Sequence, residues 1–293
     1  MTTSSNLNSL LSSGFRKRKL INIFFIFCIG LAAGVALLAL FYVFGYVLSQ
    51  GFPSLNWAFF TQIPRPVGET GGGMGNALAG TAILILLSTG VGVPWGIFTG
   101  VYLSEYGRGK LGRLVRFSTD LLTSVPSIIM GLFVYVLLVI PMRRFSAIAG
   151  ALALAFIMVP IVARTTEELL RLVPVHIREA GLALGLPRWK VILWIVLRGS
   201  LGGITTGIML AVARVAGETA PLLFTALGNN YWHQSLDQPI SSLPVQIYNY
   251  AISPFEDLHR QAWAGALVLI LFVFAINITT RLVLRPAPTA GRD

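Results

Sequence analysis

Two charged residues, Arg214 and Glu218, stand within a mostly apolar run, residues 200–227, that is long enough to cross a bilayer. A charge near the middle of a membrane helix costs at least about 2.5 kcal/mol, so such side chains usually face a protein interior or a water-filled path. Their spacing of four residues places both on one face of a helix. A guanidinium binds an oxyanion through two hydrogen bonds and keeps its proton. The pair therefore indicates either an anion path or an ion pair that fixes helix packing.

Small residues precede this pair on the same predicted helix. Gly203, Gly207 and Ala211 recur at a spacing of four. Such a ridge lets the backbone of another helix approach closely. We expect a packed helix that presents its polar groups toward the inside of a bundle.

The composition sets the class of protein that must position these residues. The chain has 293 residues, of which 55% are hydrophobic and 11% charged, and its mean hydropathy is +0.76. These values are typical of an integral membrane protein. Because unpaired backbone groups are not tolerated in lipid, each span is expected to be an α-helix. The sequence predicts an all-α protein with six transmembrane helices, at about residues 20–48, 77–103, 120–140, 145–163, 200–227 and 262–283.

The predicted domain organisation follows from these spans. An N-terminal tail, residues 1–19, precedes a six-helix membrane domain, residues 20–284, and a C-terminal tail, residues 285–293, follows it. Within the membrane domain, residues 164–198 form a large loop outside the bilayer, in which Thr165 and Glu168 match a capping box that would begin a helix. Pro126 lies inside the third predicted helix, where we expect a kink.

The distribution of positive charge gives the orientation. Of the 22 Lys and Arg residues, 17 fall in the N-terminal tail, the loops before the third and fifth helices, and the C-terminal end of the chain from Arg281 onward. Cytoplasmic segments carry such an excess, so both ends of the chain are predicted to be cytoplasmic. The Arg143-Arg144 pair in a short external turn departs from this rule. Topology thus explains the net charge of +11 without nucleic acid.

The sequence shows no apparatus for catalysis or metal binding. It has one cysteine, Cys28, three scattered histidines, and neither a His-Glu-x-x-His pair nor a Gly-x-Ser-x-Gly elbow. The glycine-rich residues 71–75 lack the lysine of a phosphate loop. We therefore predict no catalytic residue, no metal site and no cofactor in this chain, which favours transport. A secondary transporter or channel, active as an isolated chain, remains an alternative, as does an enzyme acting on phosphorylated lipid, for which no nucleophile is visible.

The loop at residues 164–198 has the pattern of short helices. Ile177, Ala180 and Leu184 recur at helical spacing between charged residues, which gives an apolar strip with charged borders. Such a strip suits a groove in a partner protein or the headgroup layer of a membrane, and the spacing favours neither.

A recognisable motif lies in the same loop. Glu179-Ala180-Gly181, followed by Gly185 and then by Ile195 and Leu197, resembles the EAA signature of ABC importer permeases. The chain departs from that signature at Gly181, where the family has alanine, and at Arg198, where it has proline.

Three further blocks narrow the resemblance to the permease subunits of phosphate-specific ABC importers. They begin at Val125-Pro126-Ser127-Ile128, at Arg164-Thr165-Thr166 and at Ala213-Arg214, the last running through Gly217 to Leu223. The likeness covers about residues 76–226. Permeases for other oxyanions, such as molybdate or sulfate, are the nearest alternatives, and the block from Gly217 to Pro221 favours phosphate.

This resemblance implies a type I importer permease in the inner membrane. The partners that it implies are a second permease subunit, two copies of an ATPase that binds ATP and Mg, and an external phosphate-binding protein. It assigns the segment with Glu179, Ala180, Gly181 and Gly185 to a coupling helix that docks on the ATPase. It links the arginines that match Arg164 and Arg214 to phosphate passage, together with a glutamate that matches Glu218. We hypothesise that Glu218 screens Arg214 while the path is empty.

Overall fold

The structure is a computed structural model that describes residues 3–69 and 71–283. The predicted C-terminal tail, residues 285–293, lies outside the described residues. Helices and loops make up the described ranges, in which no strand occurs. The all-α prediction is therefore confirmed. The chain divides into two compact units, residues 1–50 and residues 51–293.

The first unit is a single helix, α1, which runs from Thr3 to Gly51. It contains the whole first predicted span, residues 20–48, and its apolar part is long enough to cross a membrane. The predicted tail, residues 1–19, is helical from Thr3 onward, and α1 continues without a break through the basic residues Lys17, Arg18 and Lys19.

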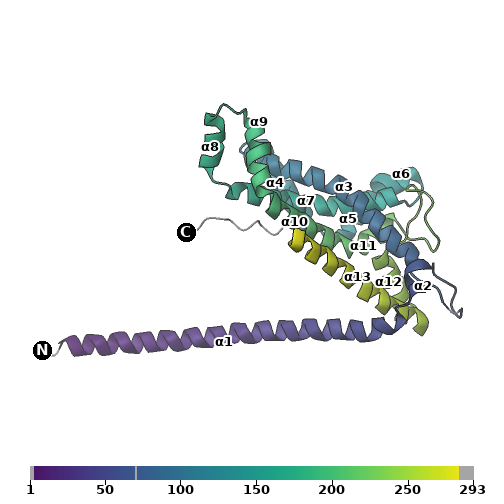
Figure 1. Cartoon of the computed structure of the whole chain (residues 1–293), viewed down its shortest axis with the longest axis horizontal. Helices are drawn as coiled ribbons and strands as arrows, with labels where there is room; N and C mark the ends of the chain where they lie inside the picture. The colour runs from purple at the N-terminus through teal and green to yellow at the C-terminus, as the bar shows by residue number, and fades with distance from the viewer. Residues whose placement is uncertain (1–2, 70, 284–293) are drawn as a thin grey trace. The chain divides into compact units, whose positions relative to one another are not determined.

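The second unit holds the remaining helices (Figure 1). Its α8 and α9 lie at one end, and α2 and α12 lie at the other. Five helices of the described chain, α1 included, are long and apolar enough to span a membrane, and a bent pair makes a sixth. The elements are η1 (Phe52–Ser54), α2 (Trp57–Thr61), α3 (Gly75–Glu105), α4 (Lys110–Ser124), α5 (Ser127–Val134), η2 (Tyr135–Val139), α6 (Ile140–Met142), α7 (Ala147–Leu172), α8 (Val175–Ala183), α9 (Arg188–Lys190), η3 (Val191–Leu197), α10 (Arg198–Ala216), α11 (Ala220–Thr225), α12 (Leu243–Ala251) and α13 (Glu256–Val283).

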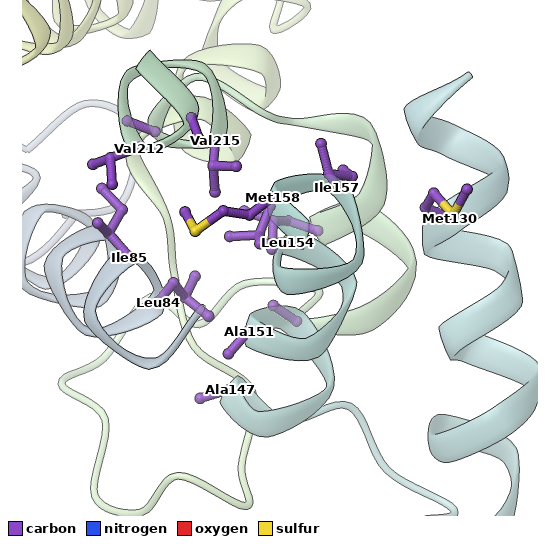
Figure 2. Close-up of a cluster of buried hydrophobic side chains, with 14 of the residues drawn as sticks. Leu84, Ile85, Met130, Ala147, Ala151, Leu154, Ile157, Met158, Val212 and Val215 are labelled. Atoms are coloured by element: carbon purple, nitrogen blue, oxygen red, sulfur yellow. The ribbon is translucent and has the colours of Figure 1, made fainter. Parts of the chain in front are cut away.

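Helix α7 is the centre of the second unit. Its most apolar stretch is 67% buried, against 39% for α3 and 28% for the span that contains α10. Figure 2 shows Leu154 and Met158 of α7 among side chains of α3 and α10. On α3, Gly96 leaves the space that Val162 fills, since a Cβ at Gly96 would lie 2.6 Å from the Val162 Cβ.

The small residues of α10 pack against α7 as the sequence predicts. Gly203 faces Leu169, Gly207 faces Thr165, and Ala211 is fully buried in the core. The close approach of the two backbones follows from the missing side chains. The predicted ridge is confirmed, and its partner is the fourth membrane helix.

The third predicted helix is broken rather than kinked. Helix α4 ends at Ser124, α5 begins at Ser127, and the two axes differ by 108°. Val125 and Pro126 between them are extended, with ψ near 132° and 138°. Proline disfavours helical geometry in the residue before it and offers no N–H to the preceding turn. The predicted boundaries, residues 120–140, are therefore wrong at their start.

The large predicted loop is shorter in the structure. Helix α7 continues to Leu172, and the next span begins at Arg188, so only residues 173–187 connect them. No helix begins at Thr165, because its hydroxyl donates to the carbonyl of Ile161 one turn earlier within α7. The capping-box prediction is wrong, and the loop boundaries 164–198 contract at both ends. Sequence reasoning ended the spans at the first charges, although both helices extend past them.

Two ion pairs of opposite polarity join α4 to α7. Arg116 of α4 donates from Nη2 to Glu167 at 2.7 Å and from Nε to the same oxygen at 3.0 Å. One helical turn away, the pair is reversed, and Arg164 of α7 binds Asp120 of α4. Arg171 also reaches Glu167, at 2.6 Å. The Glu167 side chain is only 9% exposed, so two arginines compensate one buried carboxylate.

The external segment after α11 is partly helical. It contains α12, and the backbone N–H of Leu243 at the start of α12 donates to Thr81 of α3 at 2.7 Å. Arg144, one of the two external arginines that depart from the charge rule, pairs with Asp237 at 2.8 Å. The Ser235 hydroxyl donates to the same carboxylate and lowers the pKa of Asp237. The positive charge of Arg144 lowers this pKa further.

We predict that Gly207→Ala destabilises the fold while Gly202→Ala does not. A Cβ at Gly207 would overlap the Thr165 side chain, whereas nothing lies within 4 Å of one at Gly202. Overpacking costs about 1–3 kcal/mol, and alanine in an open helix position gains up to about 1 kcal/mol over glycine. Thermal unfolding of the two purified variants measures the difference. Equal transition temperatures would contradict the packing of α10 on α7.

We also predict that Glu167→Gln is more destabilising than the same change at the adjacent Glu168. Without its charge, Glu167 leaves Arg116 and Arg171 uncompensated, which costs up to about 3 kcal/mol. The Glu168 side chain is 64% exposed, and an exposed pair contributes less than about 1 kcal/mol. Thermal unfolding compares the two variants. A larger fall in transition temperature with Glu168→Gln than with Glu167→Gln would show that the ion pairs of Glu167 contribute little to stability.

Candidate functional site

Arg214 and Glu218 lie where the fifth membrane helix ends. Helix α10 stops at Ala216, Gly217 caps it, and Glu218 sits in the short break before α11. The Arg214 Nε lies 3.7 Å from Glu218 Oε1, a distance that fits an ion pair but is too long for a hydrogen bond. The sequence correctly predicts that the two side chains meet.

The prediction of one continuous helix over residues 200–227 is wrong. Pro221 sits in the first turn of α11, where its missing N–H costs nothing, and Gly217 ends α10. The break also lets α11 pack closely on α5, since a Cβ at Gly131 would lie 2.5 Å from the Pro221 Cα. Glu218 is therefore held by a backbone turn and not by a helix face.

Arg214 faces the break between α4 and α5. It lines a narrow space together with Val125 and Ser127 from that break and with Ile157 and Ile161 from the middle of α7. Its side chain is 52% exposed, whereas that of Glu218 is 15% exposed. The guanidinium thus keeps free surface opposite the middle of α7.

Arg164 lies three residues beyond Ile161 along α7, on the side toward α8 from the residues around Arg214. Asp120 of α4 and Glu168 of α7 both bind it, the latter at 3.1 Å from Nε. No hydrogen bond or ion pair joins Arg164 to Arg214 in the described part of the chain. The structure therefore separates the three predicted path residues into two charge clusters, one around Arg164 and one around Arg214.

Asp120 is a functional candidate that the sequence did not single out. It lies in α4, four residues after Arg116, and its contact with Arg164 indicates its role. The sequence did hold a signal for these two ion pairs. Arg116 precedes Asp120 by four residues, and Arg164 precedes Glu167 by three, so each helix carries a cation and an anion about one turn apart. That signal becomes readable only once α4 and α7 are known to pack together.

The predicted coupling segment is α8 and the turn after it. Glu179 and Ala180 are exposed, and α8 stands at one end of the second unit (Figure 1). Gly181 instead faces inward, and a Cβ there would lie 3.0 Å from Val191 and Ile195 of η3. Gly185 has φ +78°, a left-handed conformation that ends the helix and favours glycine. Two of the four predicted residues thus face outward, and two shape the segment.

Arg178 fastens α8 to the helix bundle. Its Nη2 donates to Glu105 of α3 at 2.8 Å and to the Leu170 carbonyl at 2.7 Å, and its Nη1 donates to the Val173 carbonyl at 2.5 Å. The Arg178 and Glu105 side chains are only 19% and 7% exposed. A buried, multiply bonded guanidinium satisfies the free carbonyls at the end of α7. Movement of α8 is therefore linked directly to α3 and α7.

The apolar strip of α8 is uncovered. Ile177, Ala180 and Leu184 are all exposed, and Leu184 is among the most exposed apolar side chains of the described residues. Both predicted uses of the strip, a partner groove and a headgroup layer, stay open on this geometry.

Metal-binding chemistry has no site within residues 3–69 and 71–283. No group of three or more His, Cys, Asp or Glu side chains that could hold a metal ion occurs there. The chemistry of the site is therefore that of arginines and carboxylates.

Comparisons with known proteins agree with this arrangement. Residues 92–285 match the family model described as the binding-protein-dependent transport system inner membrane component. The chain is 49% identical over 237 residues to the phosphate transport system permease protein PstA of Yersinia pestis, covering 80% of each chain. To the PstA protein of Xylella fastidiosa strain Temecula1 it is 46% identical over 272 residues, covering 92% of this chain and 94% of that protein.

A solved structure shares the fold. The inward-facing MetNI methionine ABC transporter matches with a TM-score of 0.58 and 19% identity, covering 72% of this chain and 92% of that one. At this identity the likeness shows the fold alone. The family match covers more than half of the chain, and the relatives above align over most of their own length. The chain therefore belongs to the family of inner membrane components of binding-protein-dependent transport systems, and it is a multi-pass permease subunit of an ABC importer.

Proposed function

We propose that this permease carries inorganic phosphate across the inner membrane as part of an ATP-driven importer. The observation that carries the proposal is the half-exposed guanidinium of Arg214 opposite the middle of α7, with a carboxylate beside it. Relatives that are nearly half identical over most of the chain are named phosphate transport permeases, which supports phosphate as the cargo.

The chemistry of the site suits an oxyanion. Arginine presents several N–H donors in a planar fork and stays charged, so it can hold phosphate oxygens without proton exchange. Glu218 screens this charge in the empty path and limits how tightly the anion is held. Arg164 offers a second guanidinium, which its two carboxylate partners release when the anion replaces them. Phosphate thus passes between two arginines instead of resting on one.

The energy for transport comes from other subunits. We propose that this chain pairs with a second permease subunit, that an ATPase dimer binds ATP and Mg and docks on α8, and that an external binding protein delivers phosphate. The exposed Glu179 and Ala180, with the uncovered strip of α8, support this docking surface. Both chain termini would then lie in the cytoplasm, on the α8 side, as the distribution of Lys and Arg indicates.

Movement of α8 would reach the path through the bonds of Arg178. Closure of the ATPase dimer shifts α8, and α8 is fixed to Glu105 of α3 and to the end of α7. Helix α7 in turn carries Arg164 and lines the space at Arg214. Rigid-body coupling of this kind switches a transporter between inward-facing and outward-facing states.

We predict that Arg214→Gln abolishes ATP-dependent phosphate uptake while the ATPase stays bound. The variant keeps roughly the size of the side chain and removes the charge that attracts the anion, so uptake should fall by about a hundredfold, as for loss of one partner of a hydrogen-bonded charge pair. Uptake of labelled phosphate, sulfate and molybdate into vesicles containing the assembled transporter measures the effect. Arg198→Gln, an exposed arginine of the same helix, is the control.

Normal uptake in the Arg214→Gln transporter would refute the assignment of Arg214 to the path. Strong uptake of sulfate or molybdate by the unmodified transporter would instead favour another oxyanion as the cargo.

A second prediction concerns Glu218→Gln. Without the carboxylate, phosphate is held more strongly by Arg214, so the transport KM should fall, and the maximal rate should fall by about tenfold as release slows. The same vesicles give both constants. Unchanged transport together with unchanged phosphate-stimulated ATPase activity would remove Glu218 from the mechanism and leave the pair a packing feature.

A further inference from the structure

A second cluster of arginines lies far from Arg214, around a cavity of about 420 Å³ at the α8 end of the second unit. The cavity is enclosed by the end of α3, the end of α7, α8 and the start of the next span. Its charged lining consists of Glu105, Arg108, Arg171, Arg178, Glu179 and Arg188. Four arginines against two glutamates leave a net charge of +2 on the lining.

The arginines differ in how far their donors are already used. Arg178 is committed to Glu105 and to two carbonyls. Arg188 uses one nitrogen for the Glu105 carbonyl, at 2.8 Å, and stacks 4.8 Å from the Tyr106 ring. Arg171 uses Nη2 for Glu167. The guanidinium of Arg108 makes no hydrogen bond or ion pair with any described residue. Three guanidiniums, from three different elements, therefore retain free N–H donors at one cavity.

Three arginines with free donors match a phosphate group better than a carboxylate. Free phosphate carries up to two negative charges and a phosphodiester carries one, and both present at least two unesterified oxygens that several guanidiniums can share. Apart from Ser104, the remaining wall of the cavity is apolar, with Val173, Leu182 and Ile192 among its residues. The volume exceeds that of a bare anion and lies in the range of roughly 300 to 1,000 Å³ found for small-ligand sites. An anion with carbon attached, such as a phospholipid headgroup, fits this mixed lining, as does free phosphate with water.

We propose that this cavity is a binding site for a phosphate group, distinct from the transport path, whose source is either an anionic phospholipid or free inorganic phosphate. Its residues include none of Arg164, Arg214 and Glu218, so the inference does not rest on the proposed transport of phosphate. A bound phosphate group joins Arg108 after α3, Arg171 of α7 and Arg188 of α9 beside the coupling segment. Occupancy therefore restricts the movement of α8 relative to α3 and α7.

The test uses the full-length chain in nanodiscs of phosphatidylcholine, carrying Arg214→Gln to weaken anion binding in the transport path, so that a dependence on Arg108 reports on the cavity. Two probes are applied, labelled orthophosphate in equilibrium binding and phosphatidylglycerol counted by native mass spectrometry. The variants are Arg108→Gln and Arg108→Glu. Arg113→Gln is the matched control, because Arg113 is an exposed arginine nearby that does not line the cavity.

We expect saturable binding of at least one probe, weakened about tenfold or more by Arg108→Gln, as for loss of a charge-assisted bond, and further by Arg108→Glu. Arg113→Gln should bind as the parent does, and all variants should unfold at the same temperature, because the Arg108 side chain makes no internal bond. Binding of orthophosphate identifies free phosphate as a ligand, and binding of phosphatidylglycerol alone identifies the lipid.

Two results would overturn the proposal. One is that neither probe binds saturably, and the other is that Arg113→Gln weakens binding as much as Arg108→Gln. Neither result bears on transport, which is judged by uptake in the Arg214→Gln transporter, so the two proposals fail separately.

Discussion

The close contact of α3 and α10 with α7 is the constraint on which the rest of this structure depends. In a bilayer, helices gain little from hiding apolar side chains from one another, so packing must come from backbones that approach closely. Gly96 and Gly207 provide that approach on opposite partners of α7. The contact turns the charged side of α7 and the end of α10 toward α4 and α5. Arg214 can then meet the break at Pro126, although the two are far apart in sequence.

Charge compensation along α7 follows from the same packing. Nearest the α8 end of the helix, Glu167 is bound by two arginines. Further toward the middle, Arg164 is bound by two carboxylates. Beside Ile161, Arg214 has a single carboxylate partner, Glu218. The most buried of these charges, Glu167, is thus compensated by two arginines, as the cost of an unpaired charge in a low dielectric requires. Arg214 is the least compensated of these groups and also keeps half of its surface free, so it has the most to gain from an incoming anion.

Long-range structure was predictable from the sequence where one physical rule governed it. Apolar length predicts the spans, small-residue spacing predicts the ridge of α10, and a spacing of four predicts the meeting of Arg214 and Glu218. The boundaries failed where two rules compete: Arg164 looks like the end of a span, but Asp120 and Glu168 compensate it, so α7 continues to Leu172. The breaks after Val125 and Gly217 depend on how tightly α5 and α11 must pack, which local sequence does not contain.

The same reasoning explains why the sequence predicts Arg178 as a charged border of the α8 strip and not as a buried residue. An arginine at the border of an amphipathic helix normally reaches into solvent or headgroups, and its sequence neighbours give no other indication. In the structure it is mostly buried, because the end of α7 leaves carbonyls without partners and α3 ends with Glu105 beside them. One side chain therefore satisfies the end of a membrane helix and fixes the orientation of α8. Since α7 also carries the path residues, a force applied to α8 cannot be absorbed locally and must move the bundle.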